Sequence, residues 1–65
     1  MKYEELNIMA KLFCIREYVS EIVPYEDLDD VPVGDIEYDI IETLKASKEL
    51  TIDQSGKWFY EGRRV

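Results

Sequence analysis

The side chains that could do chemistry are concentrated in one acidic segment. YEDLDDVPVGDIEYDIIE, residues 25–42, contains eight Asp and Glu residues, and no Lys or Arg occurs between Arg16 and Lys45. Two carboxylates can act as a general acid and a general base only where their surroundings move their pKa values apart. Carboxylates on loops and outward helix positions are normally solvated. The segment therefore predicts a negatively charged surface, and we expect no catalytic residues and no enzyme.

Other kinds of site lack the residues that they need. DLDDVPVGDIEYD does not have the alternating ligands, central Gly and final Glu of an EF-hand loop. SGKW lacks the first Gly and the hydroxyl residue of a phosphate-binding loop. The chain has no His, and Cys14 is its single Cys, so neither a zinc site nor an intrachain disulfide is expected. We expect no metal and no cofactor, and Cys14 is interpreted as a small buried hydrophobe.

Length and net charge limit the class of protein and its partners. A chain of 65 residues with a net charge of -7 should form one domain, near the lower limit for folding alone. A core of this size supplies a net stability of about 3–5 kcal/mol, so a partner subunit would help to stabilise the fold. The negative field repels nucleic acid and anionic membrane and attracts basic protein surfaces. Charges follow Met1 directly, and no apolar stretch approaches the roughly 20 residues that cross a bilayer, so we expect a cytoplasmic protein.

Residues 3–23 are predicted to form one long helix with two apolar stripes. The first stripe recurs at helical intervals and comprises Ile8, Leu12, Ile15, Val19 and Ile22. The second is confined to the first half of the helix and comprises Leu6, Met9, Ala10 and Phe13. Two interpretations stay open: a wide buried face in a tiny domain, or a homodimer or partner surface formed by Leu6, Met9 and Phe13.

Pro24, Pro32 and Gly34 separate this helix from the next one. Pro24 should end the first helix, and residues 24–31 are expected to give a short extended piece and a helical turn. Residues 35–49 are predicted to form the second helix, with Asp35 as its N-cap. Its outward side would carry Asp35, Asp39, Glu42 and Glu49, with Tyr38 beside them.

Residues 50–61 are predicted to form a β-hairpin. The loop Gln54–Ser55–Gly56, with Gly56 in the left-handed conformation, would place Asp53 opposite Lys57. The same register faces four side chains towards the core, Leu50, Ile52, Trp58 and Tyr60, and turns Phe59 outward. Residues 62–65 are interpreted as a basic tail.

The order of these elements resembles that of a winged-helix domain, an α+β fold. The likeness is carried by VPYEDL, DIEYDIIETLKASKEL and LTIDQSGKWFY, which would be the first strand with its helix, the recognition helix and the wing. Winged-helix proteins that bind DNA usually place the recognition helix in the major groove. Here that helix would present acids, and the DNA-contacting candidates are only Lys57, Arg63 and Arg64, although phosphate contacts need Lys or Arg.

Two functional hypotheses follow from these patterns. In the first, the protein is a small acidic interaction module, a regulator or inhibitor that imitates a nucleic acid and occupies a basic site on a nucleic-acid-binding protein. Composition of this kind is typical of proteins of phages and other mobile elements. The predicted contact residues are Asp27, Asp29, Asp30, Asp35, Tyr38, Asp39, Glu42, Glu49 and Phe59. The alternative is a dimeric winged-helix transcriptional regulator that binds DNA.

Overall fold

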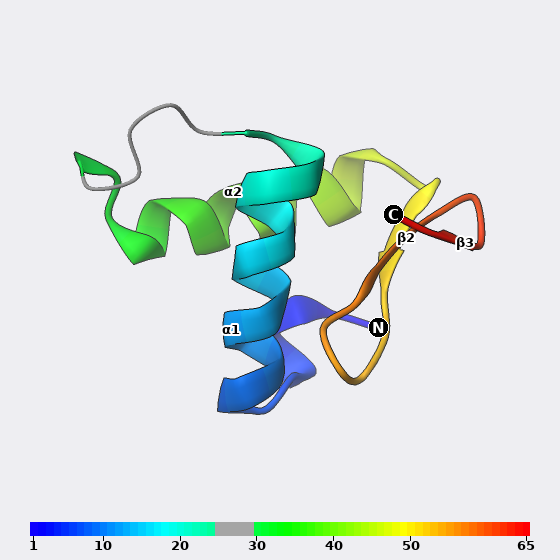
Figure 1. Cartoon of the computed structure of the whole chain (residues 1–65), viewed down its shortest axis with the longest axis horizontal. Coiled ribbons are helices and arrows are strands. Elements are labelled where there is room, and N and C mark those ends of the chain that lie inside the picture. The colour runs from blue at the N-terminus through cyan, green and yellow to red at the C-terminus, as the bar shows by residue number, and fades with distance from the viewer. Residues whose placement is uncertain (25–29) are drawn as a thin grey trace.

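The chain forms two helices that cross each other, followed by a small antiparallel sheet beside them (Figure 1). We describe it from a computed structural model, in which residues 1–24 and 30–65 are described. The elements are η1 (Tyr3–Glu5), α1 (Ile8–Glu17), η2 (Tyr18–Ile22), α2 (Val33–Ala46), β1 (Leu50–Ile52), β2 (Trp58–Tyr60) and β3 (Arg63–Arg64). The predicted α+β class, with helix, helix and hairpin in that order, is confirmed.

The predicted continuous helix over residues 3–23 is wrong, because the chain changes conformation twice. The 3-10 turn η1 ends at Leu6, and α1 starts anew after Asn7, whose side-chain oxygen accepts a hydrogen bond from the amide of Ala10 at 2.9 Å. Asn is a favoured N-cap residue for this reason. At the other end α1 widens into the π-helical turn η2, which closes with a bond from the Val23 amide to the Tyr18 carbonyl.

The buried side of α1 is not the stripe that periodicity favoured. Ile8 and Leu12 are exposed, whereas residues spaced by four line the core: Leu6, Ala10, Cys14 and Tyr18. The reason is the close approach of the hairpin loop, since a Cβ added to Gly56 would overlap the carbonyl oxygen of Ala10. The chain can approach so closely because the residues of α1 next to Gly56 are small, namely Ala10 and Cys14. The later part of the predicted stripe, Ile15, Val19 and Ile22, is partly buried against the core.

The second helix begins and ends earlier than predicted. Pro32, and not Asp35, is the N-cap residue, and its carbonyl accepts a hydrogen bond from the Asp35 amide at 3.0 Å. Asp35 therefore lies in the first turn, where the helix dipole stabilises a carboxylate. Ile36 and Ile40 are buried, as expected for the inward side. The strand and helical turn predicted for residues 24–31 fall largely on residues 25–29, outside the described residues, so the winged-helix likeness remains a resemblance in the order of elements.

The hairpin has the predicted register. Leu50 pairs with Tyr60, Thr51 with Phe59 and Ile52 with Trp58. Gly56 has a φ of 86°, and the Asp53 carboxylate accepts hydrogen bonds from the amides of Ser55 and Lys57, both at 2.9 Å. Tyr60 was predicted to face the core but is exposed. It lies two residues beyond Trp58, about 7 Å further along the strand, past the edge of the core.

Residues 62–65 do not form the free tail that the sequence predicted. Arg63–Arg64 pairs with β2 as a third strand, so the sheet order is β1-β2-β3. The connection is a two-residue turn, Glu61–Gly62, in which both residues have positive φ (52° and 80°). That conformation matches a type I′ turn, the usual connection of a tight hairpin.

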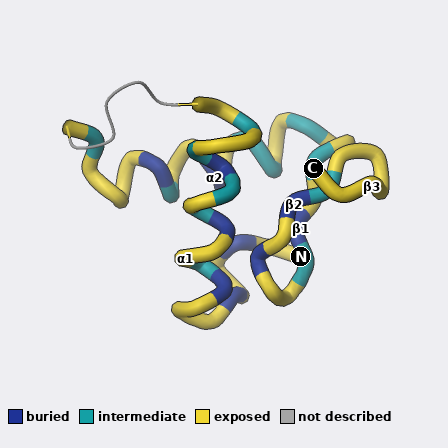
Figure 2. Tube along the Cα trace, viewed as in Figure 1, coloured by how far each residue is buried: buried dark blue, intermediate teal, exposed yellow. Residues whose placement is uncertain are grey.

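The core joins η1, α1, η2, α2, β1 and β2, with Trp58 among its fully buried residues (Figure 2). Trp58 is fully buried, its ring lies 5.4 Å from that of Tyr18, and its indole Nε1 donates to the carbonyl of Cys14 at 3.0 Å. Two tyrosine hydroxyls bind α2 at the edge of the core: Tyr3 donates to Glu37 at 2.6 Å, and Tyr18 lies 3.1 Å from the Thr43 hydroxyl. The rest of the buried core is apolar and comprises Leu6, Ala10, Cys14, Ile36, Ile40 and Ile52.

Candidate functional site

The outward side of α2 forms an acidic face. We define the acidic face as Asp35, Tyr38, Asp39 and Glu42, which are all exposed. Asp35 lies three and four residues before Tyr38 and Asp39, and these lie four and three residues before Glu42. Residues at these spacings lie on one side of a helix, about 5–6 Å apart. The opposite side buries Ile36 and Ile40, which fixes the acidic face away from the core. The helix carries no Lys or Arg before Lys45.

Tyr38 stands in the middle of this face as its one aromatic side chain. It is 63% exposed, and the pKa of its hydroxyl is raised by a hydrogen bond to the Glu42 carboxylate, by the charge of Glu42 and by that of Asp39. A partner would therefore meet a row of negative charges with an exposed phenol among them.

The structure separates Glu49 and Phe59, two of the other predicted contact residues, from the acidic face. Glu49 is exposed but lies beyond the end of α2, where its carboxylate accepts a hydrogen bond from Ser47 at 3.0 Å, so it does not continue the helical stripe. Phe59 belongs to the sheet and is half-buried, with the Arg64 guanidinium 5.8 Å from the ring centre. Asp30 is exposed before α2. Asp27 and Asp29 lie outside the described residues.

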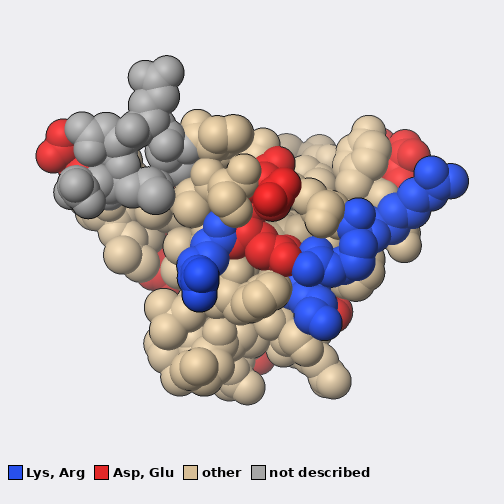
Figure 3. All heavy atoms as spheres, viewed as in Figure 1, with Lys and Arg blue, Asp and Glu red and all other residues tan. Residues whose placement is uncertain are grey.

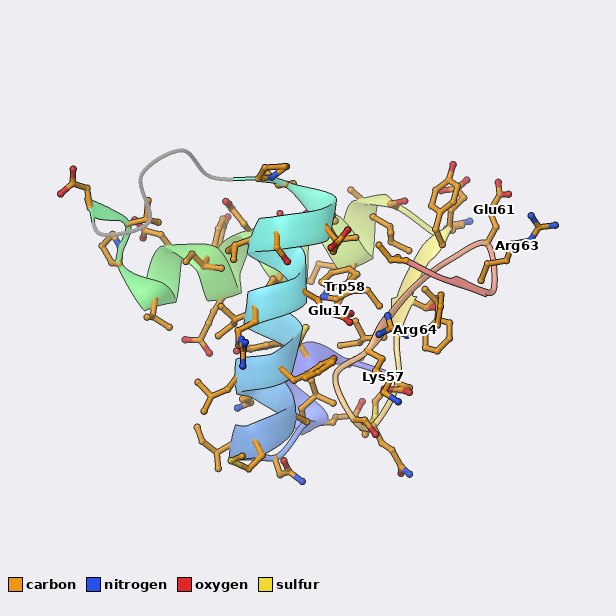
Figure 4. The ribbon with its side chains drawn as sticks, in the orientation of Figure 1. Glu17, Lys57, Trp58, Glu61, Arg63 and Arg64 are labelled. Atoms are coloured by element: carbon orange, nitrogen blue, oxygen red, sulfur yellow. The ribbon has the colours of Figure 1, made fainter. Side chains whose placement is uncertain are left out.

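The basic candidates for DNA contact lie together on the sheet, but one of them serves the fold. Arg64 forms an ion pair with Glu17 at 2.5 Å and donates to the Trp58 carbonyl at 3.0 Å (Figure 4). Lys57 and Arg63 are exposed, and the face in Figure 3 shows carboxylates beside the basic atoms. A DNA-binding surface usually neutralises several phosphates with Lys and Arg, and the two exposed cations Lys57 and Arg63 supply little of that.

Sequence reasoning missed Glu17, whose carboxylate accepts three hydrogen bonds from two residues far along the chain. Besides the Arg64 pair, its Oε2 accepts the backbone amide of Trp58 at 3.0 Å (Figure 4). Burial alone would raise the pKa of Glu17, but the hydrogen bonds from Arg64 and from the Trp58 amide, with nearby positive charge, lower it. The signal for Glu17 was its place three residues after Cys14, at the border of the buried side. It connects α1 to β2 and β3.

The residues predicted for dimerisation divide between the core and the surface. Leu6 is buried and packs within its own domain, so its assignment to a surface was wrong. Met9 and Phe13 are exposed on α1, next to the exposed Ile8 and Leu12. These four side chains form the apolar face of α1, a name that we keep below.

The described residues include neither a candidate metal-binding cluster nor a helix that could span a membrane. No group of three or more His, Cys, Asp or Glu side chains among them could hold a metal ion. None of the helices in residues 1–24 and 30–65 is long and apolar enough to span a membrane. Two distinctive faces on the described surface are the acidic face of α2 and the apolar face of α1.

The fold and these surfaces define a small α+β domain that is acidic on one helix and apolar on the other. Comparisons of the chain with protein-family models, curated proteins and solved structures found no match. The function is therefore inferred from the chemistry of the two faces.

Proposed function

We propose that the protein is a small interaction module, a regulator or inhibitor, whose acidic face binds a basic site on a nucleic-acid-binding protein. The observation that carries this proposal is the exposed row of Asp35, Asp39 and Glu42 with Tyr38 among them on one side of α2. A row of closely spaced negative charges is what a nucleic-acid backbone offers to Lys and Arg. A protein that binds nucleic acid through such groups can accept this helix in its place.

The energetics of α2 support a role beyond solubility. Asp35 and Asp39 are four residues apart, and like charges at that spacing cost a helix a few tenths of a kcal/mol. A surface with Lys or Arg at one of these positions would avoid that cost. A basic partner removes the repulsion when it binds, and opposite charges speed the encounter. Tyr38 can then serve as an aromatic anchor, as Tyr often does at interface hot spots.

Charge reversal on the acidic face tests the proposal. Asp39→Lys combined with Glu42→Lys should abolish capture of a basic nucleic-acid-binding protein from the native host's lysate, while the melting temperature stays close to that of the wild type. The matched control is Glu4→Lys with Glu21→Lys, which makes the same change in net charge at exposed positions off the acidic face. If both double variants lose the partner equally, net charge and not the acidic face governs binding.

A second measurement separates this proposal from the DNA-binding alternative. The wild type should flow through a heparin column and leave a labelled DNA duplex unshifted at physiological salt, because its charge opposes binding. A shift that disappears on replacing Lys57 and Arg63 by Ala would replace the proposal by a winged-helix regulator.

A further inference from the structure

The outward side of α1 is apolar although the other side of the same helix already packs against the core. Ile8, Met9, Leu12 and Phe13 are 69%, 72%, 50% and 38% exposed. Of the charged residues on this ten-residue helix, Lys11 and Glu17 are half-buried and Arg16 is exposed. In Figure 3 the surface over the first half of α1 is mostly uncharged. Four neighbouring exposed hydrophobic side chains form the kind of patch that marks an interaction site.

A groove lies alongside this patch. It has a volume of about 680 Å³ and runs between Met9 and Phe13 of α1 and the hairpin loop at Gln54 and Ser55, with Glu5 at its border. A ridge, formed by Ile8 and Leu12, and a groove therefore lie side by side on one surface. A two-fold dimer brings the same patch of both subunits together, so a ridge next to a groove is what self-complementarity requires.

The charges beside the apolar face favour a second copy of this chain as the partner that covers it. Residues 1–16 contain Lys2, Lys11 and Arg16 against Glu4 and Glu5, whereas the whole chain carries -7. The apolar face thus lies in a part of the chain that carries one more base than acid, although the chain as a whole is acidic. The apolar face lies on α1 and the acidic face on α2, and each helix buries another of its sides against the shared core. Contact between two copies through α1 therefore does not have to involve the acidic face.

We propose that the apolar face of α1 is the interface of a homodimer in which two α1 helices pack antiparallel about a two-fold axis between Ala10 and Lys11. This register places Ile8 against Phe13 of the partner subunit and Met9 against Leu12 of the partner subunit. It also brings Arg16 towards the partner subunit's Glu5, which is exposed at the groove. A parallel pair would instead set Arg16 against its own copy.

The dimer should be weak and concentration-dependent. Four apolar side chains per subunit cover less than the roughly 800 Å² per partner of a standard interface. We expect the monomer, of 7.7 kDa, to predominate in dilute solution and the dimer to form at tens of micromolar. The inference does not rest on the proposed function, since its test needs no partner protein.

Sedimentation equilibrium over a range of concentrations tests the interface. Met9→Gln combined with Leu12→Gln removes its centre at exposed positions, so the fold, checked by circular dichroism, should persist while the dissociation constant rises at least tenfold. Val33→Gln is the matched control, because Val33 is an exposed apolar side chain on α2 and should leave the dimer unchanged. A wild type that stays monomeric at hundreds of micromolar, or a Met9→Gln and Leu12→Gln variant that dimerises like the wild type, overturns the proposal.

A charge swap tests the antiparallel register separately. Glu5→Arg or Arg16→Glu alone should weaken the dimer severalfold, because each sets like charges against each other. The two substitutions together should restore the wild-type dissociation constant. Failure of the double variant to recover while it remains folded would overturn the antiparallel arrangement.

Discussion

The three glycines of the chain occupy three different environments, which makes them a graded test of the packing. At Gly56, with a φ of 86°, a Cβ would overlap the Ala10 carbonyl oxygen and lie 3.1 Å from the Cys14 amide nitrogen. Both are backbone atoms of α1, so no side-chain rotation can relieve the contact. Gly62 has a similar φ of 80° but open space around it. Gly34 lies in the first turn of α2 with no atom near its added Cβ.

The expected cost of each alanine follows from these environments. Gly62→Ala should lower the free energy of unfolding only by the cost of placing an L-residue in the left-handed conformation, about 1–2 kcal/mol. Gly56→Ala carries the same penalty and in addition an overpacking cost of about 1–3 kcal/mol. The total approaches the whole stability of about 3–5 kcal/mol expected for so small a domain, so the variant should be largely unfolded. Gly34→Ala should stabilise by up to about 1 kcal/mol, because alanine favours a helix.

Urea unfolding followed by Trp58 fluorescence measures all three variants, at one protein concentration so that self-association does not differ among them. The expected order of stability is Gly34→Ala, wild type, Gly62→Ala, Gly56→Ala. A Gly56→Ala protein that unfolds at the same urea concentration as Gly62→Ala would show that the hairpin loop does not contact the backbone of α1, and the account of the buried side of α1 would fail with it.

Two further predictions concern titratable groups in the core and at its border. The folded-state pKa of Glu17 is lowered, so its ionised form stabilises the native state above the unfolded-state pKa, and this contribution is lost as the pH falls through the folded-state value. Glu17→Gln should therefore cost about 1–2 kcal/mol at neutral pH, with the gap closing in acid; a gap in urea unfolding that is constant with pH would contradict the role given to its charge. Burial raises the pKa of the Cys14 thiol to about 12, so a thiol reagent at neutral pH should label it only as fast as the protein opens, and immediate stoichiometric labelling of the native protein would refute its burial.

The hairpin and α2 could be predicted because each has one clear pattern. Alternation on both sides of a Gly-containing loop fixes a single register, which the structure has. In α2 the apolar residues occupy one side only, and Pro32 and Gly34 mark its beginning. Its start shifted by two residues because the Pro32 carbonyl, and not the Asp35 side chain, begins the helix.

The first helix could not be predicted to the same depth, because it is apolar on both sides. Periodicity finds the stripes but does not say which one meets the core. The decision falls to residues that carry little hydrophobic signal, Ala10 and Cys14, since only they admit the backbone at Gly56. The third strand was missed for a related reason: Arg63 and Arg64 have no apolar pattern, and their pairing depends on the turn at Glu61–Gly62.

The acidic face was predictable in position, since helical spacing and the burial of Ile36 and Ile40 fix it together. Glu49 was misplaced because the helix ends at Ala46. The role of Glu17 depends on partners far along the chain, the Trp58 amide and Arg64. A local sequence pattern does not predict contacts between residues so far apart in the sequence.

The contact between Cys14 and Trp58 has a consequence for folding during synthesis. The core joins residues near the start of the described chain, such as Tyr3 and Leu6, to Trp58, and the bonds of Glu17 extend the connection to Arg64. Long-range contacts of this kind form only after the intervening chain is available. On a ribosome, α1 would therefore emerge with both its sides uncovered and would wait for the hairpin to leave the exit tunnel. During that interval its apolar surface is open to chaperones, and the native domain should form in one late step once Trp58 is free.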